Sequence, residues 1–209
     1  MRLIIPTFLL LLFALCAPVM AAGEKSEARQ TLEAKLDEVF AILDKPEFKD
    51  PAKRAPLMQE VKDKIYSICD FQEFSARTVG GRWRSFTPQQ QHDFEDAFGE
   101  LLFETYNSKL LSYEGQRFKF IQEIVGSKGD KVEIQTTLPY DGKEAPVNYR
   151  MIKKPEGWKV YDMIIENVGL VQNYRNQFQD ILNKQTPEQL IQTIRDKAKE
   201  TRDKNHALK

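Results

Sequence analysis

Apolar residues recur at helical spacing between Phe94 and Tyr113, and polar side chains occupy the opposite side. Just upstream, Thr87 can cap a helix with its hydroxyl, Pro88 suits the first helical position, and Gln90 can reach back to the amide of the cap. The apolar stripe consists of Phe94, Phe98, Leu101, Leu102, Tyr106, Leu110 and Tyr113. The pattern predicts a long amphipathic helix whose buried face is rich in aromatic rings.

The same period predicts further helices on both sides of this central one. Their ranges are 24–43, about 57–69, 71–79, 170–182 and 187–194. Asp70 and Thr186 are suitable caps, because a glutamate or glutamine follows each of them three residues later. Residues 44–51 contain two prolines and are expected to form a loop. The charge-rich segment from Arg195 onward is expected to fray or to project as a solvated helix.

After Gly115 the apolar period changes from helical to alternating, which is typical of strands. Four strands are predicted, over about 117–125, 131–138, 147–153 and 158–166. Asp141-Gly142 is a strong hairpin signal between the second and third. A two-residue loop there places Leu138 opposite Ala145, Thr136 opposite Val147 and Ile134 opposite Tyr149.

This register sorts the strands into one apolar and one polar face, as in an antiparallel sheet that is buried on one side. The apolar face collects Phe118, Phe120, Ile124, Val132, Ile134, Leu138, Val147, Tyr149, Met151, Tyr161, Met163 and Ile165. Charged and amide side chains of the first three strands lie on the other face. Trp158, Val160 and Ile164 are expected on that outer side too, so another part of the chain should cover this edge.

The N-terminus has the features of a secretory signal peptide. Arg2 is followed by an apolar run that ends in the small residues Ala21 and Ala22, after either of which cleavage is expected. The alternative is a retained membrane anchor, because the run is just long enough to span a bilayer. Cleavage would remove Cys16 and leave Cys69 as a buried thiol without a disulfide partner. The chain thus divides into a signal peptide (1–22), one α+β domain (23–194) and a charged tail (195–209).

The charge balance and the candidate catalytic side chains limit the classes of function that the chain could have. Lys plus Arg and Asp plus Glu both number 31, so no net charge favours a nucleic-acid partner. His92 and His206 are far apart in the sequence, and Asp162 is expected to pair with Arg150 rather than to act as a base. No catalytic triad, metal-ligand spacing or phosphate loop is present in the sequence. We therefore expect no enzyme activity, no metal and no cofactor.

An ordered set of motifs resembles the MlaC-type periplasmic phospholipid-binding family, also called toluene-tolerance auxiliary proteins. The motifs include Arg77-Thr78-Val79-Gly80-Gly81-Arg82-Trp83-Arg84, Phe86-Thr87-Pro88-Gln89-Gln90, Val147-Asn148-Tyr149-Arg150, Gly157-Trp158-Lys159-Val160-Tyr161-Asp162 and Asn173-Tyr174-Arg175-Asn176-Gln177-Phe178. The chain departs from the family pattern at Asn167-Val168-Gly169-Leu170 and at Gln185-Thr186-Pro187.

The resemblance implies an α+β fold in which helices wrap around a four-stranded antiparallel sheet, in the manner of a nuclear-transport-factor-like cone with an internal apolar cavity. It also implies a monomeric periplasmic carrier of phospholipid between an outer-membrane lipoprotein complex and an inner-membrane ABC transporter.

On this reading the lipid contacts the apolar sheet face and the facing stripe of the central helix. The expected lining residues are Phe98, Leu102, Tyr106, Phe118, Phe120, Val132, Ile134, Val147, Tyr149, Met151, Tyr161 and Met163. Two apolar surfaces can also pack together without leaving any space, and periodicity does not distinguish the two cases. Two alternatives stay open, a periplasmic adaptor with a filled core that docks through Arg82, Trp83 and Arg84, and an enzyme of the cone fold.

Overall fold

The computed structural model describes residues 25–207, and these form an α+β fold. Its α-helices are α1 (Glu27–Leu43), α2 (Pro51–Ile68), α3 (Phe71–Val79), α4 (Pro88–Leu111), α5 (Leu170–Leu182) and α6 (Pro187–Ala207). Two short 3-10 helices, η1 (Pro46–Lys49) and η2 (Gly80–Ser85), connect them. The expected loop at 44–51 therefore contains one helical turn. The central helix and its cap are confirmed, because the hydroxyl of Thr87 accepts from the amide of Gln90 and the Gln90 side chain accepts from the amide of Thr87.

The strands form one antiparallel sheet in the order β1-β2-β3-β4-β5. Their bounds are β1 (Lys119–Val125), β2 (Lys131–Tyr140), β3 (Lys143–Lys154), β4 (Gly157–Ile165) and β5 (Val168–Gly169). The predicted hairpin is confirmed, with positive φ at both Asp141 and Gly142. Its register is also as predicted, since Leu138 pairs with Ala145 and Ile134 with Tyr149.

The sheet has five strands rather than the expected four. Glu166 and Asn167 adopt φ values of 49° and 67°, which reverse the chain directly after β4. Val168 and Gly169 then pair with Ile165 and Ile164 before α5 begins. The fifth strand is thus a two-residue extension created by this turn.

A bulge in β4 corrects part of the predicted sheet face. Arg150 pairs with Asp162, but the next residue of β3, Met151, pairs with Val160. Tyr161 is the extra residue, so the alternation of β4 is reversed from that point toward its start. Val160 and Trp158 therefore lie on the inner, apolar face, where the prediction of an outer position was wrong. Tyr161 instead packs against the guanidinium of Arg77, 4.3 Å from the ring centroid.

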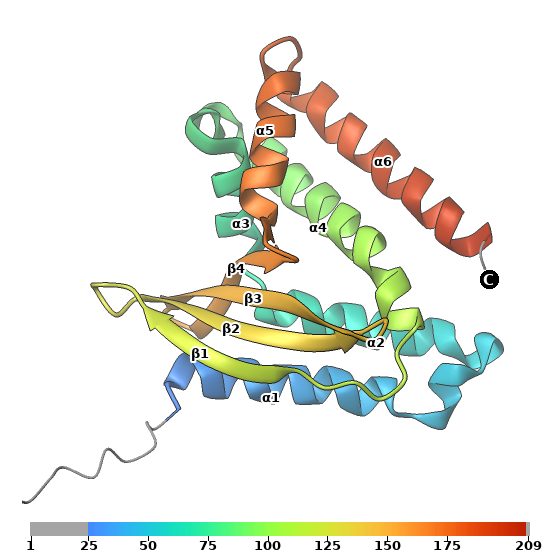
Figure 1. The fold of residues 1–209 in the computed structure, drawn as a ribbon. Coiled ribbons are helices and arrows are strands. Elements are labelled where there is room, and N and C mark those ends of the chain that lie inside the picture. The colour runs from blue at the N-terminus through green and yellow to red at the C-terminus, as the bar shows by residue number, and fades with distance from the viewer. Residues whose placement is uncertain (1–24, 208–209) are drawn as a thin grey trace, which may run out of the picture.

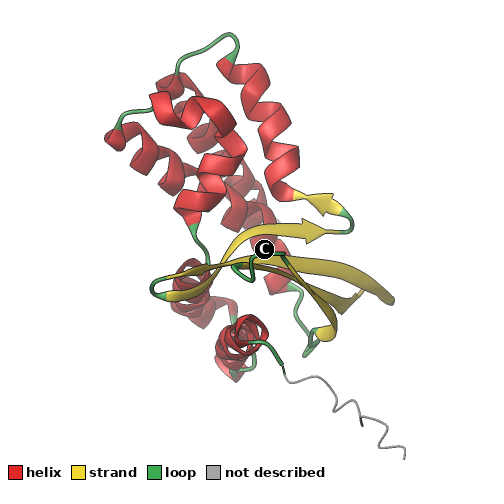
Figure 2. Ribbon diagram, turned by 90° about the vertical axis from the view of Figure 1, so that its left-hand side faces the viewer, coloured by secondary structure: helices red, strands yellow, loops and turns green. Residues whose placement is uncertain are grey.

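Helices α1 and α2 form one group beside the sheet, and α3 to α6 form a second group above it in the view of Figure 1 (Figures 1 and 2). The two groups meet, because Lys62 of α2 pairs with Glu100 of α4. Ala28 and Leu32 of α1 pack directly on the inner face of the sheet. On the opposite face, buried Asp162 bonds Arg150 at 3.0 Å and accepts from the amide of Val171, which ties the start of α5 to β4.

The N-terminal half of α4 belongs to a solid aromatic core. Phe98 is fully buried and lies between the rings of Phe74, Phe94, Tyr174 and Phe178, with centroid distances of 5.0–5.7 Å. Edge-to-face rings at these distances attract one another beyond the effect of buried area alone. This aromatic core fixes α3, α4 and α5 to one another.

The charged segment from Arg195 onward does not project from the domain as expected. It continues α6 to Ala207 and packs along α4. Ala198 is buried there, and Arg202 forms ion pairs with Glu100 and Glu104 of α4. The side chain of Asn205 also donates to the carbonyl of Glu104 at 2.8 Å. A few specific polar contacts, rather than an apolar stripe, hold this part of α6 against α4.

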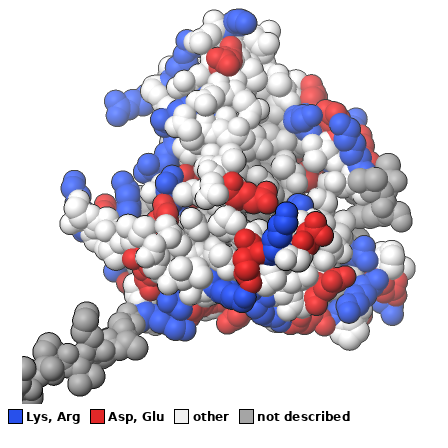
Figure 3. All heavy atoms as spheres, in the orientation of Figure 1, with Lys and Arg blue, Asp and Glu red and all other residues white. Residues whose placement is uncertain are grey.

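The signal-peptide prediction concerns residues outside the described range. Within residues 25–207, no helix combines the length and the apolar character that crossing a bilayer requires. Side chains of both charge signs are interspersed over the face shown in Figure 3, without a large patch of one sign.

Replacing Phe98 with alanine tests the solid part of the core. We expect F98A to lower the free energy of unfolding by about 3–5 kcal/mol, because the surrounding rings cannot collapse into the space. Phe103 is the matched control, since it lies on the same helix but is only half buried. Urea denaturation of both variants should give less than half the loss for F103A. Equal losses would contradict a core that is solid around Phe98.

Candidate functional site

The apolar interior is divided into three clusters rather than one. The first joins α3 to α6, the second joins α1 to the sheet, and the third joins α1, η1 and α2. A cavity of about 370 Å³ lies where the three clusters meet. Its wall takes Phe74 and Leu170 from the first cluster, Val147 and Tyr149 from the second, and Phe40 from the third.

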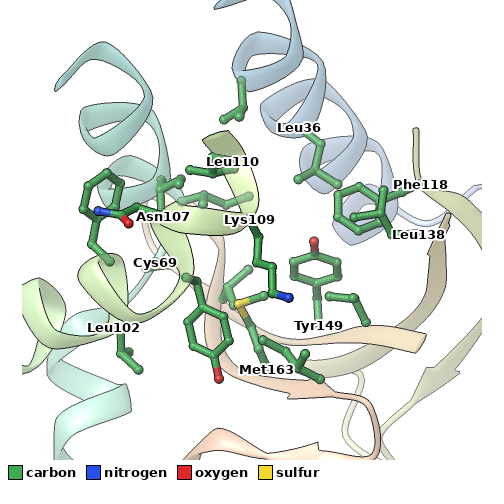
Figure 4. Close-up of a pocket in the computed structure, with 18 of the residues that line it drawn as sticks. Leu36, Cys69, Leu102, Asn107, Lys109, Leu110, Phe118, Leu138, Tyr149 and Met163 are labelled. Carbon is green, nitrogen blue, oxygen red and sulfur yellow. The ribbon is translucent and has the colours of Figure 1, made fainter. Parts of the chain in front are cut away.

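The wall of this cavity is almost entirely apolar (Figure 4). Helix α1 contributes Leu32, Leu36, Val39, Phe40 and Leu43; α2 and the following residue contribute Ile65, Tyr66, Ile68 and Cys69; α4 contributes Leu102, Phe103, Tyr106 and Leu110; the sheet contributes Leu138, Val147, Tyr149, Val160, Met163 and Ile165. Ligand sites in proteins commonly enclose about 300–1,000 Å³. The cavity therefore has the size and surface of a site for an apolar ligand.

Helix α4 has a different environment in each half. Around Phe98 it is part of the aromatic core, whereas from Leu102 to Leu110 it faces the cavity. Gly99 lies between the two parts, and a β-carbon there would stand 2.8 Å from the hydroxyl of Tyr66. The absence of a side chain at Gly99 thus lets α2 approach the middle of α4.

The polar atoms deep in the wall are uncharged. Burial raises the pKa of the Cys69 thiol to about 12 and that of the Tyr106 phenol to about 12. Burial raises the pKa of Tyr149 further still. These groups therefore remain protonated at physiological pH, and they present neutral surfaces to whatever occupies the cavity.

Six of the twelve predicted lining residues lie on the cavity wall: Leu102, Tyr106, Phe118, Val147, Tyr149 and Met163. The other six lie elsewhere. Phe98 belongs to the aromatic core, and Val132, Ile134 and Met151 pack in the cluster that joins the sheet to α1. Phe120 lines a neighbouring polar pocket of about 420 Å³, and the bulge places Tyr161 against Arg77.

The prediction did not include the contribution of α1 and α2. Leu36, Phe40 and Ile68 line the cavity, whereas helical periodicity predicts only that they face inward. The signal was present in the sequence as helical periodicity. Helical periodicity does not indicate, however, that the residues opposite this stripe are held too far away to fill the cavity.

The geometry offers little support for catalysis at this cavity. Among the described residues, no group of three or more His, Cys, Asp or Glu side chains is placed to hold a metal ion. His92 is exposed on the first turns of α4 and lies 3.4 Å from Asp96. Asp162 pairs with Arg150 as predicted and does not line the cavity.

Fold and cavity together define a class of protein, an α+β domain that encloses an apolar cavity. The comparisons identify the family within this class. The family model described as MlaC protein matches residues 33–196, and the chain therefore belongs to the MlaC family.

Individual relatives agree with this assignment. The chain is 24% identical over 142 residues to the intermembrane phospholipid transport system binding protein MlaC of Haemophilus influenzae, covering 66% of each chain. It is 24% identical over 102 residues to toluene tolerance protein ttg2D of Pseudomonas putida, covering 48% of this chain and 47% of that protein. The alignments thus span about two thirds and about half of these relatives.

A solved structure shares the fold. It is a phospholipid-binding protein from Ralstonia solanacearum in complex with a phospholipid, 27% identical in sequence, with a TM-score of 0.76. The match covers 84% of this chain and 99% of that one. The α+β fold with an antiparallel sheet is therefore that of a known phospholipid-binding protein.

The reactivity of Cys69 tests the enclosure of the cavity. With the thiol pKa raised to about 12, only about one thiol in ten thousand is ionised at pH 8. In a chain lacking residues 1–22, we expect iodoacetamide to alkylate Cys69 about a hundred-fold or more slower than in the urea-unfolded chain. Mass spectrometry of timed samples measures both rates, and equal rates would contradict a buried thiol.

Proposed function

We propose that this protein is a phospholipid carrier that holds acyl chains in the cavity between α1, α2, α4 and the sheet. The observation that carries the proposal is the cavity itself, about 370 Å³ in volume and walled by aliphatic and aromatic side chains. The Ralstonia protein, which shares the fold, was solved in complex with a phospholipid. A filled core would have left no such space.

The free energy of the exchange supports a carrier. Exposing acyl chains to water costs about 0.8 kcal/mol per methylene, so a phospholipid with roughly thirty methylenes does not cross an aqueous space unaided. A cavity lined by leucine, phenylalanine and valine offers the chains an environment similar to the bilayer interior. Uptake and release are then nearly balanced, and direction has to come from the partners.

In this proposal the acyl chains contact Leu102, Tyr106, Phe118, Val147, Tyr149 and Met163, together with the facing residues of α1 and α2. Met163 has a flexible, polarisable side chain that can adapt to chains of different shape. None of the six side chains from α4 and the sheet is charged, so no ion has to be desolvated when the chains contact them.

The proposed site of action is the periplasm, between an outer-membrane lipoprotein complex and an inner-membrane ABC transporter. The features of a signal peptide in residues 1–22 support secretion, and the name of the Haemophilus relative describes an intermembrane phospholipid transport system. In this scheme the protein carries out no catalysis, and the transporter supplies the energy.

The adaptor alternative receives less support from the geometry. Arg82 donates to the carbonyl of Leu182 and to the side chain of Asn183, so it connects η2 to α5. Trp83 packs on Phe86 and Phe94, 5.6 Å and 5.7 Å away between ring centroids. Arg82 and Trp83 therefore hold η2 against α5 and α4, while Arg84 is exposed.

The proposal predicts that phospholipid copurifies with the protein. Organic extraction followed by mass spectrometry should find phospholipid in the wild type at a stoichiometric level. The variant Y149R places an unpaired charge on the cavity wall and should retain less than about a tenth of that lipid, because burying an unpaired charge costs several kcal/mol.

I124R is the matched control, because Ile124 lies outside the cavity. Its expected place on the apolar face was wrong, since the irregularity between Phe120 and Gln122 sets it opposite Glu133, where it is 50% exposed. Circular dichroism should show that both variants are folded. A folded Y149R that retains as much lipid as I124R would show that acyl chains do not occupy this cavity.

A further inference from the structure

The charged residues of the cavity wall are few. Only Lys35, Lys109 and Glu166 carry charge among the residues that line it. Lys109 and Glu166 are exposed, and Lys35 is half buried. Since the deep wall is apolar, these three side chains mark the rim, where a ligand in the cavity would meet water.

Lys109 differs from Lys35 in its partners. The ammonium of Lys35 lies 2.8 Å from a carboxylate oxygen of Glu38, so its charge is already compensated. Within residues 25–207, Lys109 forms no ion pair with any carboxylate. It donates instead to the hydroxyl of Tyr140 at 2.7 Å and stands 4.0 Å from the centre of that ring.

The contact between Lys109 and Tyr140 spans the cavity opening. Lys109 lies in the last turn of α4, and Tyr140 is the last residue of β2, next to the hairpin turn. Helix α4 packs along α6 and α3, and both residues line the cavity that separates its last turns from the sheet. In Figure 4 the Lys109 side chain points from α4 into this space. Within residues 25–207, the hydrogen bond between Lys109 and Tyr140 is the side-chain hydrogen bond that joins α4 to the β2–β3 hairpin.

We propose that Lys109 binds the phosphate of the lipid headgroup, and that its contact with Tyr140 is a latch that the phosphate replaces. The inference rests on the proposed carrier function and assigns the recognition of the headgroup to one residue. An ammonium with a neutral partner can accept a phosphate oxygen without breaking an ion pair. The hydrogen bond of an ammonium to a phosphate, in which both groups are charged, is stronger than its hydrogen bond to a neutral phenol.

The rim recognises the phosphodiester and not the net charge of the headgroup. Lys109 contributes one positive charge and Glu166 one negative charge, while Lys35 is compensated by Glu38. Glu166 forms no ion pair within the described residues, and its amide bonds the carbonyl of Pro146 in β3, so it flanks the same opening. A headgroup with an added negative charge thus gains nothing over a zwitterionic one.

The test measures lipid preference by competition. Delipidated full-length protein is incubated with equimolar detergent-solubilised dioleoyl phosphatidylethanolamine, dioleoyl phosphatidylglycerol and dioleoylglycerol, then repurified and extracted for mass spectrometry. We expect the wild type to prefer both phospholipids over dioleoylglycerol and to take up the two phospholipids equally. K109M should lower the ratio of phospholipid to dioleoylglycerol by about two- to five-fold, the range for an exposed charged contact, and less at high salt.

Three variants separate charge from packing. K109R should restore the ratio, because it keeps the positive charge. K143M removes a lysine of the same hairpin that does not line the cavity, and it should leave the ratio unchanged. Y140F should raise the ratio, because Lys109 then gives up no hydroxyl contact when it binds the phosphate.

An excess of inorganic phosphate, at constant ionic strength, should not reduce phospholipid uptake more than chloride does. A loss specific to phosphate would show a general anion site and overturn the headgroup assignment. An unchanged ratio in K109M, or an equal fall in K143M, would also overturn it. If the wild type takes up none of the three lipids, the carrier function itself fails.

Discussion

The packing of α4 determines the rest of this structure. Its first half is fixed in an aromatic core, where Phe98 contacts four other rings, and α6 holds its outer side through Arg202 and Asn205. Its second half is therefore held in place without needing support from the sheet. Because α1 already covers the inner face of the sheet, the last turns of α4 face a space that no side chain fills. A protein interior normally closes such a space, and here the rigid aromatic core keeps it open.

The sequence alone was sufficient to predict those features of the fold that have a local cause. The capping box at Thr87 and the Asp141-Gly142 hairpin follow from residue chemistry, and the hairpin then determines the register of β2 and β3. The bulge at Tyr161 carries no glycine or proline to mark it, so alternation predicted the wrong face for Trp158 and Val160. The cavity depends on distances between elements that are remote in sequence, and hydrophobic periodicity does not encode those distances. For that reason Phe98 packs only in the aromatic core, whereas Leu102, four residues later on the same stripe, also lines the cavity.

The proposed carrier function depends on a chemical difference between the deep wall of the cavity and its rim. The deep wall is apolar, and its thiol and phenols stay neutral because burial raises their pKa values. Charge appears only at the rim, where Lys109 and Glu166 face the solvent. Acyl chains thus supply the affinity inside, while polar contacts at the opening can discriminate between lipids at a small cost in free energy. In the proposed carrier, the cavity thus binds a class of molecules by their acyl chains and contacts the headgroup only at the rim.

Photocrosslinking with a phospholipid that carries a diazirine in its acyl chain tests the central claim most directly. The protein is loaded with this lipid and irradiated, and the adducts are mapped by peptide mass spectrometry. The account predicts adducts on the cavity wall, on peptides that contain Leu36, Leu102, Tyr149 and Met163. Adducts concentrated on the exposed residues Ile121, Ile124 and Val125 of the edge strand β1 would show that the lipid adheres to the surface, and would contradict it.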